Sequence, residues 1–406
     1  MSKEKRRVPK LRFPGFTEDW EQRKLSDIST KVTTKNVDVH YTETLTNSAE
    51  QGIISQVDFF DKEISNKDNI NGYYIVDNND FIYNPRISTL APVGPINRNK
   101  LNRTGIMSPL YTVFRSSNVD LGFLEWYFQS SHWHRYMKLN GDSGARADRI
   151  AIKDSTFFEM PIKIPVNIKE QVLIGETLEK FNQYITLHQR KFEHLNLKKK
   201  ALLQKLFPKN GERYPELRFP EFTDAWEQRK ADYIFKSITD KGYPELPVLS
   251  ASQELGMVYR DQNGIDIQHD KKNETSYKRV LPGQFVIHLR SFQGGFAYSE
   301  IEGITSPAYT VMSFKNSSEQ YGLFWKHVFK SETFIKRLET ITYGIRDGRS
   351  ISFSDFKSLI LQYPSFSEQK LIGDSIAVIE RGITLHQRKL DHLQLQKKAL
   401  LQQMFV

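Results

Sequence analysis

Apolar residues recur at alternating intervals of four and three between residues 168 and 207, and this spacing is typical of a coiled-coil seam. The seam positions are Ile174, Leu178, Phe181, Ile185, His188, Phe192, Leu195, Lys199, Leu202 and Leu206. The same register returns near the end of the chain, at Ile372, Ile376, Ile379, Ile383, His386, Leu390, Leu393, Lys397, Leu400 and Met404. Pro165 and Pro364 precede the two segments, and Pro208 follows the first. The pattern predicts two long helices, each roughly 50 Å in length at about 1.5 Å per residue.

Two matching seams in one chain most simply pair with each other. We favour an antiparallel pair, which would hold the globular segments at opposite ends, related by a pseudo-twofold axis. The alternative is two separate amphipathic helices that each cover their own domain. His188 and His386 occupy identical seam positions. A polar seam residue that fixes the register is the simpler interpretation of them, beside a pH switch or a metal bridge.

The globular segments contain short β-type runs broken by turns, and each also contains one apolar stretch typical of a helix. The matching β-type runs are Phe81–Tyr83 with Phe285–Ile287, and Tyr111–Phe114 with Tyr309–Met312. The matching helical stretches are Leu121–Phe128 and Tyr321–Val328. The predicted fold class is therefore α+β, with two duplicated mixed α/β domains separated by two long helices paired as an antiparallel coiled coil.

The chain is an internal duplication of a domain and a helix. Leu11–Lys24 returns as Leu217–Lys230 with 11 of 14 positions identical, and Ile185–Phe207 returns as Ile383–Phe405 with 17 of 23 identical. The sequence between these blocks has diverged, which suggests two domains that recognise different targets on one repeated frame. The predicted segments are a first domain at 1–167, a central helical spacer at 168–211, a second domain at 212–365 and a C-terminal helical spacer at 366–406.

Composition narrows the class of protein. With 406 residues the chain is long enough for two domains with their own cores, and it contains no cysteine, which excludes disulfides, thiolate zinc sites and a cysteine nucleophile. No apolar run approaches the roughly 20 residues of a membrane span, so the expected location is the cytoplasm. The net charge of +10 favours a polyanionic partner such as nucleic acid.

Catalytic signatures are scarce. There is no Gly-rich phosphate loop. Asn84-Pro85-Arg86 lacks the second proline and the aromatic residue of the amino-methyltransferase motif, and we interpret it as a turn. His132 and His134 could bind a metal, but no clustered carboxylate or thiolate accompanies them, and an ordinary helix surface is the simpler interpretation. We predict no catalytic residue and no metal site.

Arginines inside the diverged domains are the candidates for nucleic-acid contact, because an arginine fork can bind guanine O6 and N7 or a phosphate. The alternative for any one of them is a structural ion pair. The candidate arginines are Arg86, Arg146 and Arg149 in the first domain and Arg290, Arg346 and Arg349 in the second. Nearby hydrogen-bonding candidates are Tyr83, Asn84, Ser88, His288 and Gln293. Lys198, Lys199 and Lys200 suit the end of a helix, and contact with phosphates is the alternative.

The duplicated blocks resemble those of the specificity subunit of type I restriction–modification systems, over essentially the whole chain. The resemblance rests on Leu11–Lys24 and Leu217–Lys230, and on the two Ile-Thr-Leu-His-Gln-Arg-Lys helices ending in Lys-Lys-Ala-Leu-Leu-Gln. It implies two target-recognition domains that each read half of an asymmetric, bipartite double-stranded DNA site, and helices that set the spacer between the halves.

The resemblance also implies partners. Two methyltransferase subunits and two motor–nuclease restriction subunits would join the chain, and the methyl donor and ATP would belong to them, so no cofactor is expected here. Identical partners need identical surfaces, so Trp20, Trp226 and the outer helix faces are candidates for docking. A buried structural tryptophan at the junction of domain and helix is the alternative.

Two other functions stay open. An unrecognised nuclease or DNA methyltransferase would show turnover by the isolated chain. A scaffold that clamps two copies of a partner would bind without regard to DNA sequence and without the salt dependence of phosphate neutralisation.

Overall fold

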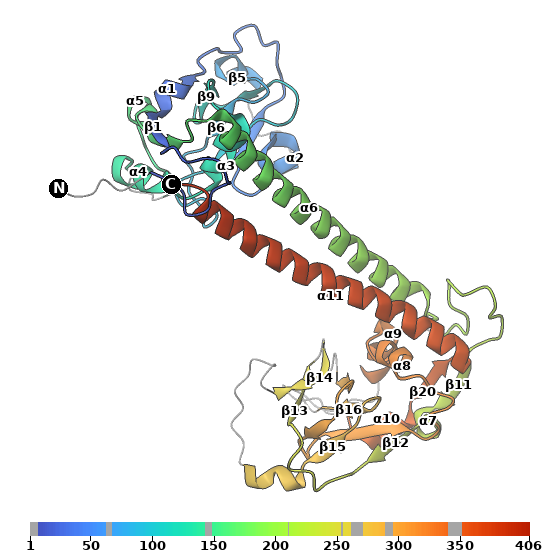
Figure 1. Cartoon of the computed structure of the whole chain (residues 1–406). Helices are drawn as coiled ribbons and strands as arrows, with labels where there is room; N and C mark the ends of the chain where they lie inside the picture. The colour runs from blue at the N-terminus through green and yellow to red at the C-terminus, as the bar shows by residue number, and fades with distance from the viewer. Residues whose placement is uncertain are drawn as a thin grey trace. The chain divides into compact units, whose positions relative to one another are not determined.

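Each predicted seam lies in a helix of 38 residues in the computed structural model, except for its last position, Leu206 or Met404, which follows the helix directly (Figure 1). The structure describes residues 7–61, 67–142, 148–209, 211–252, 255–260, 271–288, 295–339 and 351–406. The first long helix is α6 (Ile168–Lys205) and the second is α11 (Phe366–Gln403). Every predicted seam position is buried or half-buried. The prediction of two long helices with matching seams is confirmed.

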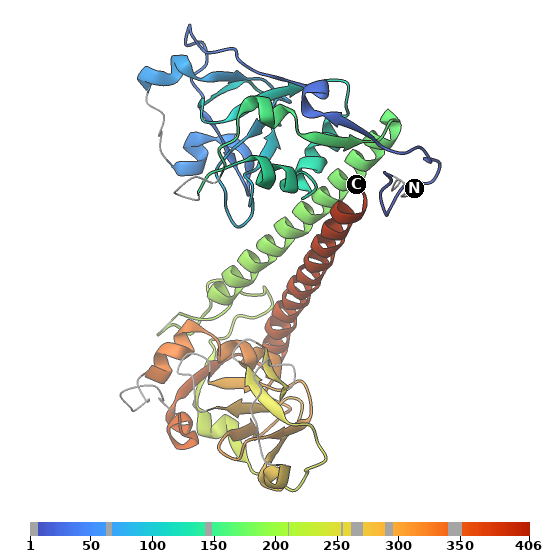
Figure 2. The same cartoon turned by 90° about the vertical axis from the view of Figure 1, so that its left-hand side faces the viewer.

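Each of two compact units contains parts of both long helices. The first unit comprises Met1–Gln189 with Arg388–Val406, and the second comprises Arg190–Gln387. In the first unit Lys397 Nζ donates to Asn182 Oδ1 at 2.8 Å, and in the second Lys199 Nζ lies 2.7 Å from Glu380 Oε1. In both units the later part of one helix lies beside the earlier part of the other (Figure 2). The helices therefore run antiparallel in each unit, as predicted, whereas the pseudo-twofold relation stays a prediction.

The first domain contains ten strands and five short α-helices within its described residues. Its strands are β1 (Glu21–Lys24), β2 (Ser29–Lys31), β3 (Leu45–Ser48), β4 (Gly52–Ser55), β5 (Tyr74–Val76), β6 (Phe81–Tyr83), β7 (Ile96–Arg98), β8 (Gly105–Met107), β9 (Thr112–Ser116) and β10 (Pro161–Ile164). Its helices are α1 (Leu25–Ile28), α2 (Gln56–Phe60), α3 (Leu121–Gln129), α4 (His134–Asn140) and α5 (Asp154–Phe158), with a 3-10 turn η1 (Lys67–Gly72).

The second domain repeats this plan. Its strands are β11 (Glu227–Lys230), β12 (Phe235–Ile238), β13 (Leu249–Ser252), β14 (Gly256–Tyr259), β15 (Lys278–Val280), β16 (Phe285–Ile287), β17 (Phe296–Tyr298), β18 (Gly303–Thr305), β19 (Thr310–Phe314) and β20 (Ile360–Tyr363). Its described helices are α7 (Ala231–Ile234), α8 (Gly322–Val328), α9 (Glu332–Glu339) and α10 (Phe353–Ser358), with a 3-10 turn η3 (Lys271–Ser276).

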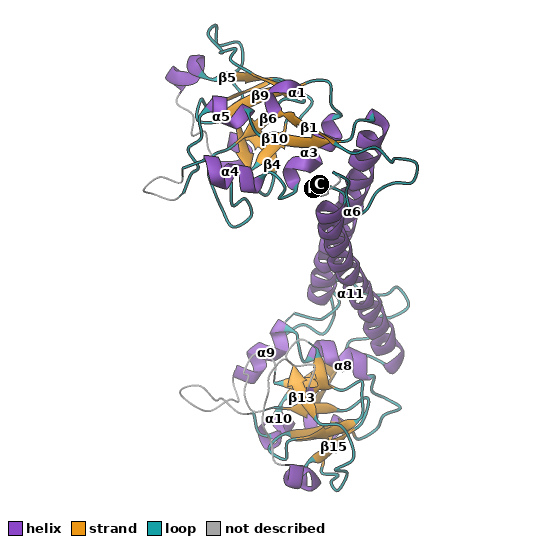
Figure 3. Cartoon of the chain, turned by 60° about the vertical axis from the view of Figure 1, so that its left-hand side comes forward, coloured by secondary structure: helices purple, strands orange, loops and turns teal. Residues whose placement is uncertain are grey.

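The strands pair identically in the two domains. A four-stranded antiparallel sheet has the order β2-β9-β6-β7 in the first and β12-β19-β16-β17 in the second. Three two-stranded pairs surround it in each, namely β1-β10, β3-β4 and β5-β8, matched by β11-β20, β13-β14 and β15-β18. Figure 3 shows the strands in the middle of each domain with the short helices around them. The α+β prediction and the predicted matching runs are confirmed.

Alternation along the central strands gives each sheet a core on both faces. On β6, Phe81 and Tyr83 join a large aromatic cluster, whereas Ile82 joins a smaller aliphatic cluster. In the second domain Phe285 and Val286 divide between two clusters in the same way. Successive side chains of a strand point to opposite faces, so a three-residue strand contributes to two cores.

The duplicated block beginning at Leu11 fastens each domain to both long helices. Arg12 makes a bidentate ion pair with Glu170 in the first turn of α6, with Nε–Oε1 at 2.7 Å and Nη2–Oε2 at 2.8 Å. The neighbouring Leu11 N–H donates to the Gln403 carbonyl at the end of α11 at 2.9 Å. The last carbonyls of a helix lack partners within it, so this bond satisfies one of them. We call this arrangement the clasp.

The second unit has the same clasp. Arg218 binds Glu368 with Nε–Oε1 at 2.9 Å and Nη2–Oε2 at 2.8 Å, and the Leu217 N–H donates to the Lys205 carbonyl at 2.9 Å. Each block thus joins the start of one long helix to the end of the other. The near-identity of these blocks follows from this shared structural task.

Candidate nucleic-acid interface

The structure brings Arg86 and Arg149 together from distant parts of the sequence. The two residues face each other as an isolated antiparallel bridge. The Ile87 N–H donates to the Asp148 carbonyl at 2.9 Å, and the Ile150 N–H donates to the Pro85 carbonyl at 2.9 Å. Both arginines are exposed, and neither side chain takes part in an ion pair or hydrogen bond among the described residues. Two exposed arginines without a carboxylate partner, on paired backbone segments, favour an anionic or hydrogen-bond-accepting ligand.

A cavity of about 230 Å³ opens beside these arginines. Its walls come from β3 and the following turn, helix α2, the turn after β6, and the turn before β9. The lining residues that matter for recognition are Asn47, Phe59, Phe60, Arg86, Leu110 and Arg149. The Asn47 amide is bonded within the domain, since it donates to the Ile82 carbonyl and accepts from Asn97 Nδ2. The arginines and the apolar side chains are the kinds of group that contact the edges of bases.

Tyr83 is a core residue, and its prediction as a DNA contact is wrong. It is 1% exposed, its ring stacks on Phe157 with centroids 5.0 Å apart, and its hydroxyl donates to the Val93 carbonyl at 3.1 Å. Burial raises the pKa of the Tyr83 hydroxyl far above its usual value. The alternation of β6 points Tyr83 and Phe81 to the same aromatic core, which the sequence pattern had indicated without deciding the face.

Asn84 and Ser88 shape the turn that carries Arg86. Asn84 Nδ2 donates to the Asn47 carbonyl at 2.8 Å, and its Oδ1 accepts from the Arg86 N–H at 3.0 Å. Ser88 is exposed, and its hydroxyl accepts from the Ala91 N–H at 3.1 Å. Both line the cavity beside Arg86. Asn84 therefore positions the arginine, and a direct contact of either residue with DNA stays a prediction.

Most candidates of the second domain lie outside the described residues. These are Arg290, Gln293, Arg346 and Arg349, as is Arg146 of the first domain. His288 is described; it is half-buried, and its ring lies 6.2 Å from that of Tyr309. Its contact with DNA stays a prediction.

Trp20 and Trp226 are buried at the junctions of domain and helix, so their prediction as partner contacts is wrong. Each is 1% exposed. Trp20 lies edge-on against Phe405, just beyond α11, and Trp226 lies edge-on against Phe207, just beyond α6. The Trp20 indole N–H also donates to Glu170 Oε1 at 3.3 Å. The tryptophans complete the clasp, which is the structural alternative that the sequence had left open.

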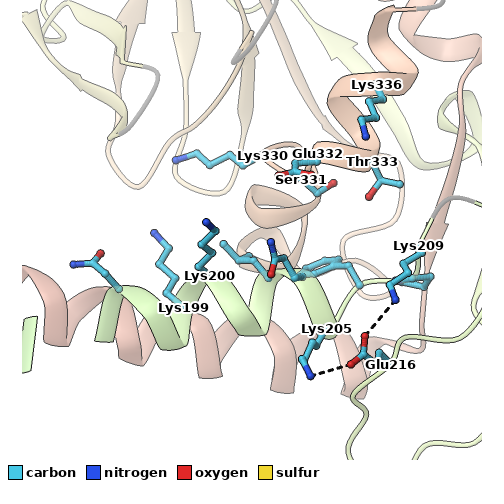
Figure 4. A pocket seen from close by; sticks show the side chains of 15 residues that line it. Lys199, Lys200, Lys205, Lys209, Glu216, Lys330, Ser331, Glu332, Thr333 and Lys336 are labelled. Atoms are coloured by element: carbon cyan, nitrogen blue, oxygen red, sulfur yellow. Dashed lines mark ion pairs between the residues drawn. The ribbon is translucent and has the colours of Figure 1, made fainter. Parts of the chain in front are cut away.

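The second unit contains a larger pocket, of about 800 Å³, between the end of α6 and the start of α9 (Figure 4). Several lysines line it: Lys199, Lys200, Lys205, Lys209, Lys330 and Lys336. Lys205 and Lys209 both pair with Glu216, at 2.9 and 3.3 Å, and Lys199 pairs with Glu380. Lys200 and Lys336 take part in no ion pair within the described part of the chain. Of the predicted lysine run, only Lys199 and Lys200 reach this pocket.

The side chains of His132 and His134 make contacts within their own domain. His132 Nδ1 lies 3.1 Å from Ser130 Oγ, and the ring of His134 packs edge-on against Trp133 at 4.9 Å. Burial lowers the pKa of both, that of His134 to about 4. Among the residues that the structure describes, no group of three His, Asp or Glu side chains could hold a metal ion. None of the described helices is long and apolar enough to cross a membrane.

Sequence reasoning missed Phe59, Phe60 and Leu110 as cavity residues. The only signal was an apolar cluster in a short surface segment, Val57 to Phe60, followed by Asp61. That pattern is equally typical of a core strand or helix, and only the structure shows that it is exposed.

No family model matches the sequence. Among solved structures, the S subunit of a type I restriction–modification system from M. genitalium matches with a TM-score of 0.59 and 14% identity, over 98% of this chain and 99% of that one. The chain has the fold of a type I restriction–modification S subunit. A chain from a structure of complex assembly and conformational transition of a type I system (TM-score 0.46, 13% identity, 98% and 99% coverage) is also similar. So is the HsdS subunit from Thermoanaerobacter tengcongensis (TM-score 0.44, 14% identity, 95% and 96% coverage).

Proposed function

We propose that this chain is the DNA-specificity subunit of a type I restriction–modification complex. The observation that carries the proposal is the match to an S subunit over essentially the full length of both chains, which includes both domains and both long helices. The paired arginines beside a cavity in the first domain add support, because they offer the groups that bind base edges and phosphates.

In this proposal each domain reads one half of an asymmetric, bipartite site on double-stranded DNA. The antiparallel helices set the spacer between the halves. Two methyltransferase subunits and two restriction subunits assemble on the chain and bring the methyl donor and ATP. The chain itself binds no cofactor, catalyses no reaction and works in the cytoplasm.

A map of adenine methylation in the host genome, with and without this gene, tests the proposal. We expect the gene's deletion to remove one bipartite motif with a constant gap. Replacing residues 30–165 by another such domain should change one half of that motif only. An unchanged map, with the methyltransferase partner expressed, would contradict the proposal.

Arg86→Ala and Arg149→Ala test the candidate interface directly. Each should weaken binding of the assembled methyltransferase complex to its site by about 5- to 150-fold, as expected for loss of a bidentate contact of roughly 1–3 kcal/mol. Substituted bases in the first domain's half-site should then cost less in the variant than in the parent. Arg135→Ala is the matched control, because Arg135 is an exposed arginine of the same domain that does not line the cavity.

A protein scaffold that does not read DNA makes a different prediction. It would bind its partners equally well with any DNA, and its DNA affinity would not depend on either arginine. A titration of the complex against specific and scrambled duplexes at several salt concentrations separates the two functions.

A further inference from the structure

Helix α2 presents apolar side chains that its domain does not bury. Val57 is 49% exposed, Phe59 is 38% exposed and Phe60 is 39% exposed, and no side chain of the helix is buried. The rings of Phe59 and Phe60 lie edge-to-face with centroids 4.7 Å apart. Single exposed apolar residues are ordinary on protein surfaces. Two adjoining phenylalanines at one site indicate a surface that contacts something else.

The two phenylalanines line the same cavity as Arg86 and Arg149. Leu110, which is 63% exposed, lies on the same lining and enlarges the apolar part. Asn47 does not add a free amide, since its Nδ2 donates to the Ile82 carbonyl at 2.7 Å. Beside the hydroxyl groups of its rim, the cavity therefore offers a ligand two arginine guanidinium groups and an apolar surface.

Arginines next to an apolar surface match the groups that base pairs display in the major groove of DNA. Arginine binds guanine O6 and N7, and the one apolar group displayed in that groove is the C5-methyl of thymine, which phenylalanine contacts. A phosphate would use the arginines and leave the apolar wall exposed to water. The edge of a thymine next to a guanine would use both.

We infer that Phe59 and Phe60 contact a thymine methyl group in the half-site read by the first domain, beside the base that Arg86 or Arg149 contacts. The inference rests on the proposed function and assigns the specificity of the first domain to helix α2 as well as to the arginines. The matching position in the second domain differs, because Ala308 follows Ser306-Pro307 where Leu110 follows Ser108-Pro109. The second domain therefore lacks this part of the apolar surface.

Replacement of single thymines by deoxyuridine tests the inference, because deoxyuridine lacks only the methyl group. The probe is a set of duplexes carrying the mapped site, with one thymine at a time replaced in either half. Binding is measured for the complex of the full chain with its methyltransferase partner. One replacement in the first half-site should weaken binding about four-fold, the effect of removing one buried methyl group.

The same duplexes are then measured with Phe59→Ala, Phe60→Ala and the double variant. In the variant that removes the contact, the deoxyuridine replacement should weaken binding by less than about 1.5-fold. The base replacement and the phenylalanine substitution are then not additive. Leu90→Ala is the matched control: Leu90 is 70% exposed in the same domain and does not line the cavity, so the deoxyuridine effect should persist. Thermal unfolding of each variant verifies that the domain is folded.

The outcomes distinguish this inference from the proposed function. An undiminished deoxyuridine effect in the double variant, or no effect of any first-half replacement, would overturn the thymine contact. Equal loss of affinity for specific and scrambled DNA would overturn it as well, and would indicate a contact with the backbone. If the parent complex shows no sequence preference at all, the proposed function fails with it.

Discussion

The two units bury the same position of the duplicated helix in two different ways. In the first unit Lys397 donates to the neutral Asn182 and lies 4.7 Å from the centroid of the Trp126 ring. Burial lowers the pKa of Lys397. In the second unit the equivalent Lys199 pairs with Glu380 at 2.7 Å. One unit surrounds its lysine with an amide and an aromatic face, and the other neutralises it with a carboxylate.

Two glycines of the long helices show which residues of α3 and α8 face the two lysines. A Cβ on Gly175 would lie 2.9 Å from the backbone nitrogen of Phe123, and one on Gly373 would lie 2.9 Å from that of Phe324. The helices α3 and α8 thus meet the long helices at the same point. Three residues further on, Trp126 and His327 occupy equivalent places.

His327 is the unusual member of this pair. It is 1% exposed, and its Nε2 has no hydrogen-bond partner among the described residues. Burial lowers its pKa to about 4, although the nearby Glu380 opposes that shift. Burial would raise the pKa of Glu380, but the hydrogen bond from Lys199 and the positive charge of Lys326 lower it to about 2.

The repeated helices therefore determine where the lysine lies, whereas the diverged residues around it determine which group compensates its charge. A charge in the seam is tolerated in both units because each provides a different compensation. The clasp is the opposite case, since both units use the same arginine–glutamate pair. Substitutions at the clasp should therefore destabilise both units, whereas substitutions at the lysines should affect the two units differently.

The largest effect is expected at the clasp. Arg218→Ala leaves Glu368, which is 1% exposed, without its cation, and should destabilise the second unit by about 3–5 kcal/mol. Arg12→Ala should cost the first unit somewhat less, because Glu170 keeps the Trp20 indole N–H. Hydrogen exchange measured by mass spectrometry assigns the loss to each unit. A loss below about 1 kcal/mol in both would contradict this role for the clasp.

Acid should weaken the second unit through His327. The folded pKa of about 4 lies below the ordinary value of 6.5, so between these values the unfolded chain takes up a proton that the folded chain does not. Stability is therefore complete above about pH 6.5 and falls towards pH 4, by up to about 3 kcal/mol. His327→Phe should flatten this dependence in the second unit.

Measurements of His327→Phe at pH 8 separate packing from protonation, because the parent histidine is neutral there. The first unit provides an internal reference, although His132 and His134 give it an acid sensitivity of its own. An identical slope with pH for parent and variant in the second unit would refute the assignment.

Exchanging the lysine partners should have a smaller effect. Glu380→Asn gives the second unit the partner of the first, and should destabilise it by about 1–2 kcal/mol, because Lys199 loses a charged hydrogen bond. Asn182→Glu should change the first unit by less than about 0.5 kcal/mol, since Glu179 is one turn away and repels the new carboxylate. Urea unfolding followed by hydrogen exchange and mass spectrometry measures the stability of each unit in the two variants. If the two substitutions changed the free energy of unfolding by equal and opposite amounts, the other charges around each lysine would have no influence.

The smallest effect is expected at the lysine pocket of the second unit. Lys200→Ala with Lys336→Ala should leave stability unchanged and lower the slope of log K against log salt by at most about 2 for DNA binding. The matched control replaces Lys205 and Lys209, which are already paired with Glu216. An unchanged slope would place this pocket outside the nucleic-acid interface.

The sequence alone determined the long helices, the central strands and the duplication of the domain in this protein. The intervals of four and three residues predicted both long helices, because a helix that pairs must keep one stripe apolar. The β-type runs predicted the central strands, and the duplicated blocks predicted two domains of one plan. These signals are local or repeated, so they can be found without knowing what packs against what.

Only the tertiary structure decided which residues form the site. Arg86 and Arg149 lie 63 positions apart in the sequence, and a backbone bridge unites them. The burial of Tyr83, Trp20 and Trp226, and the exposure of Phe59 and Phe60, depend on which elements cover each side chain. An aromatic residue suits a core and a binding surface equally well in sequence. Its role is fixed by contacts between distant segments, and these exist only in the folded chain.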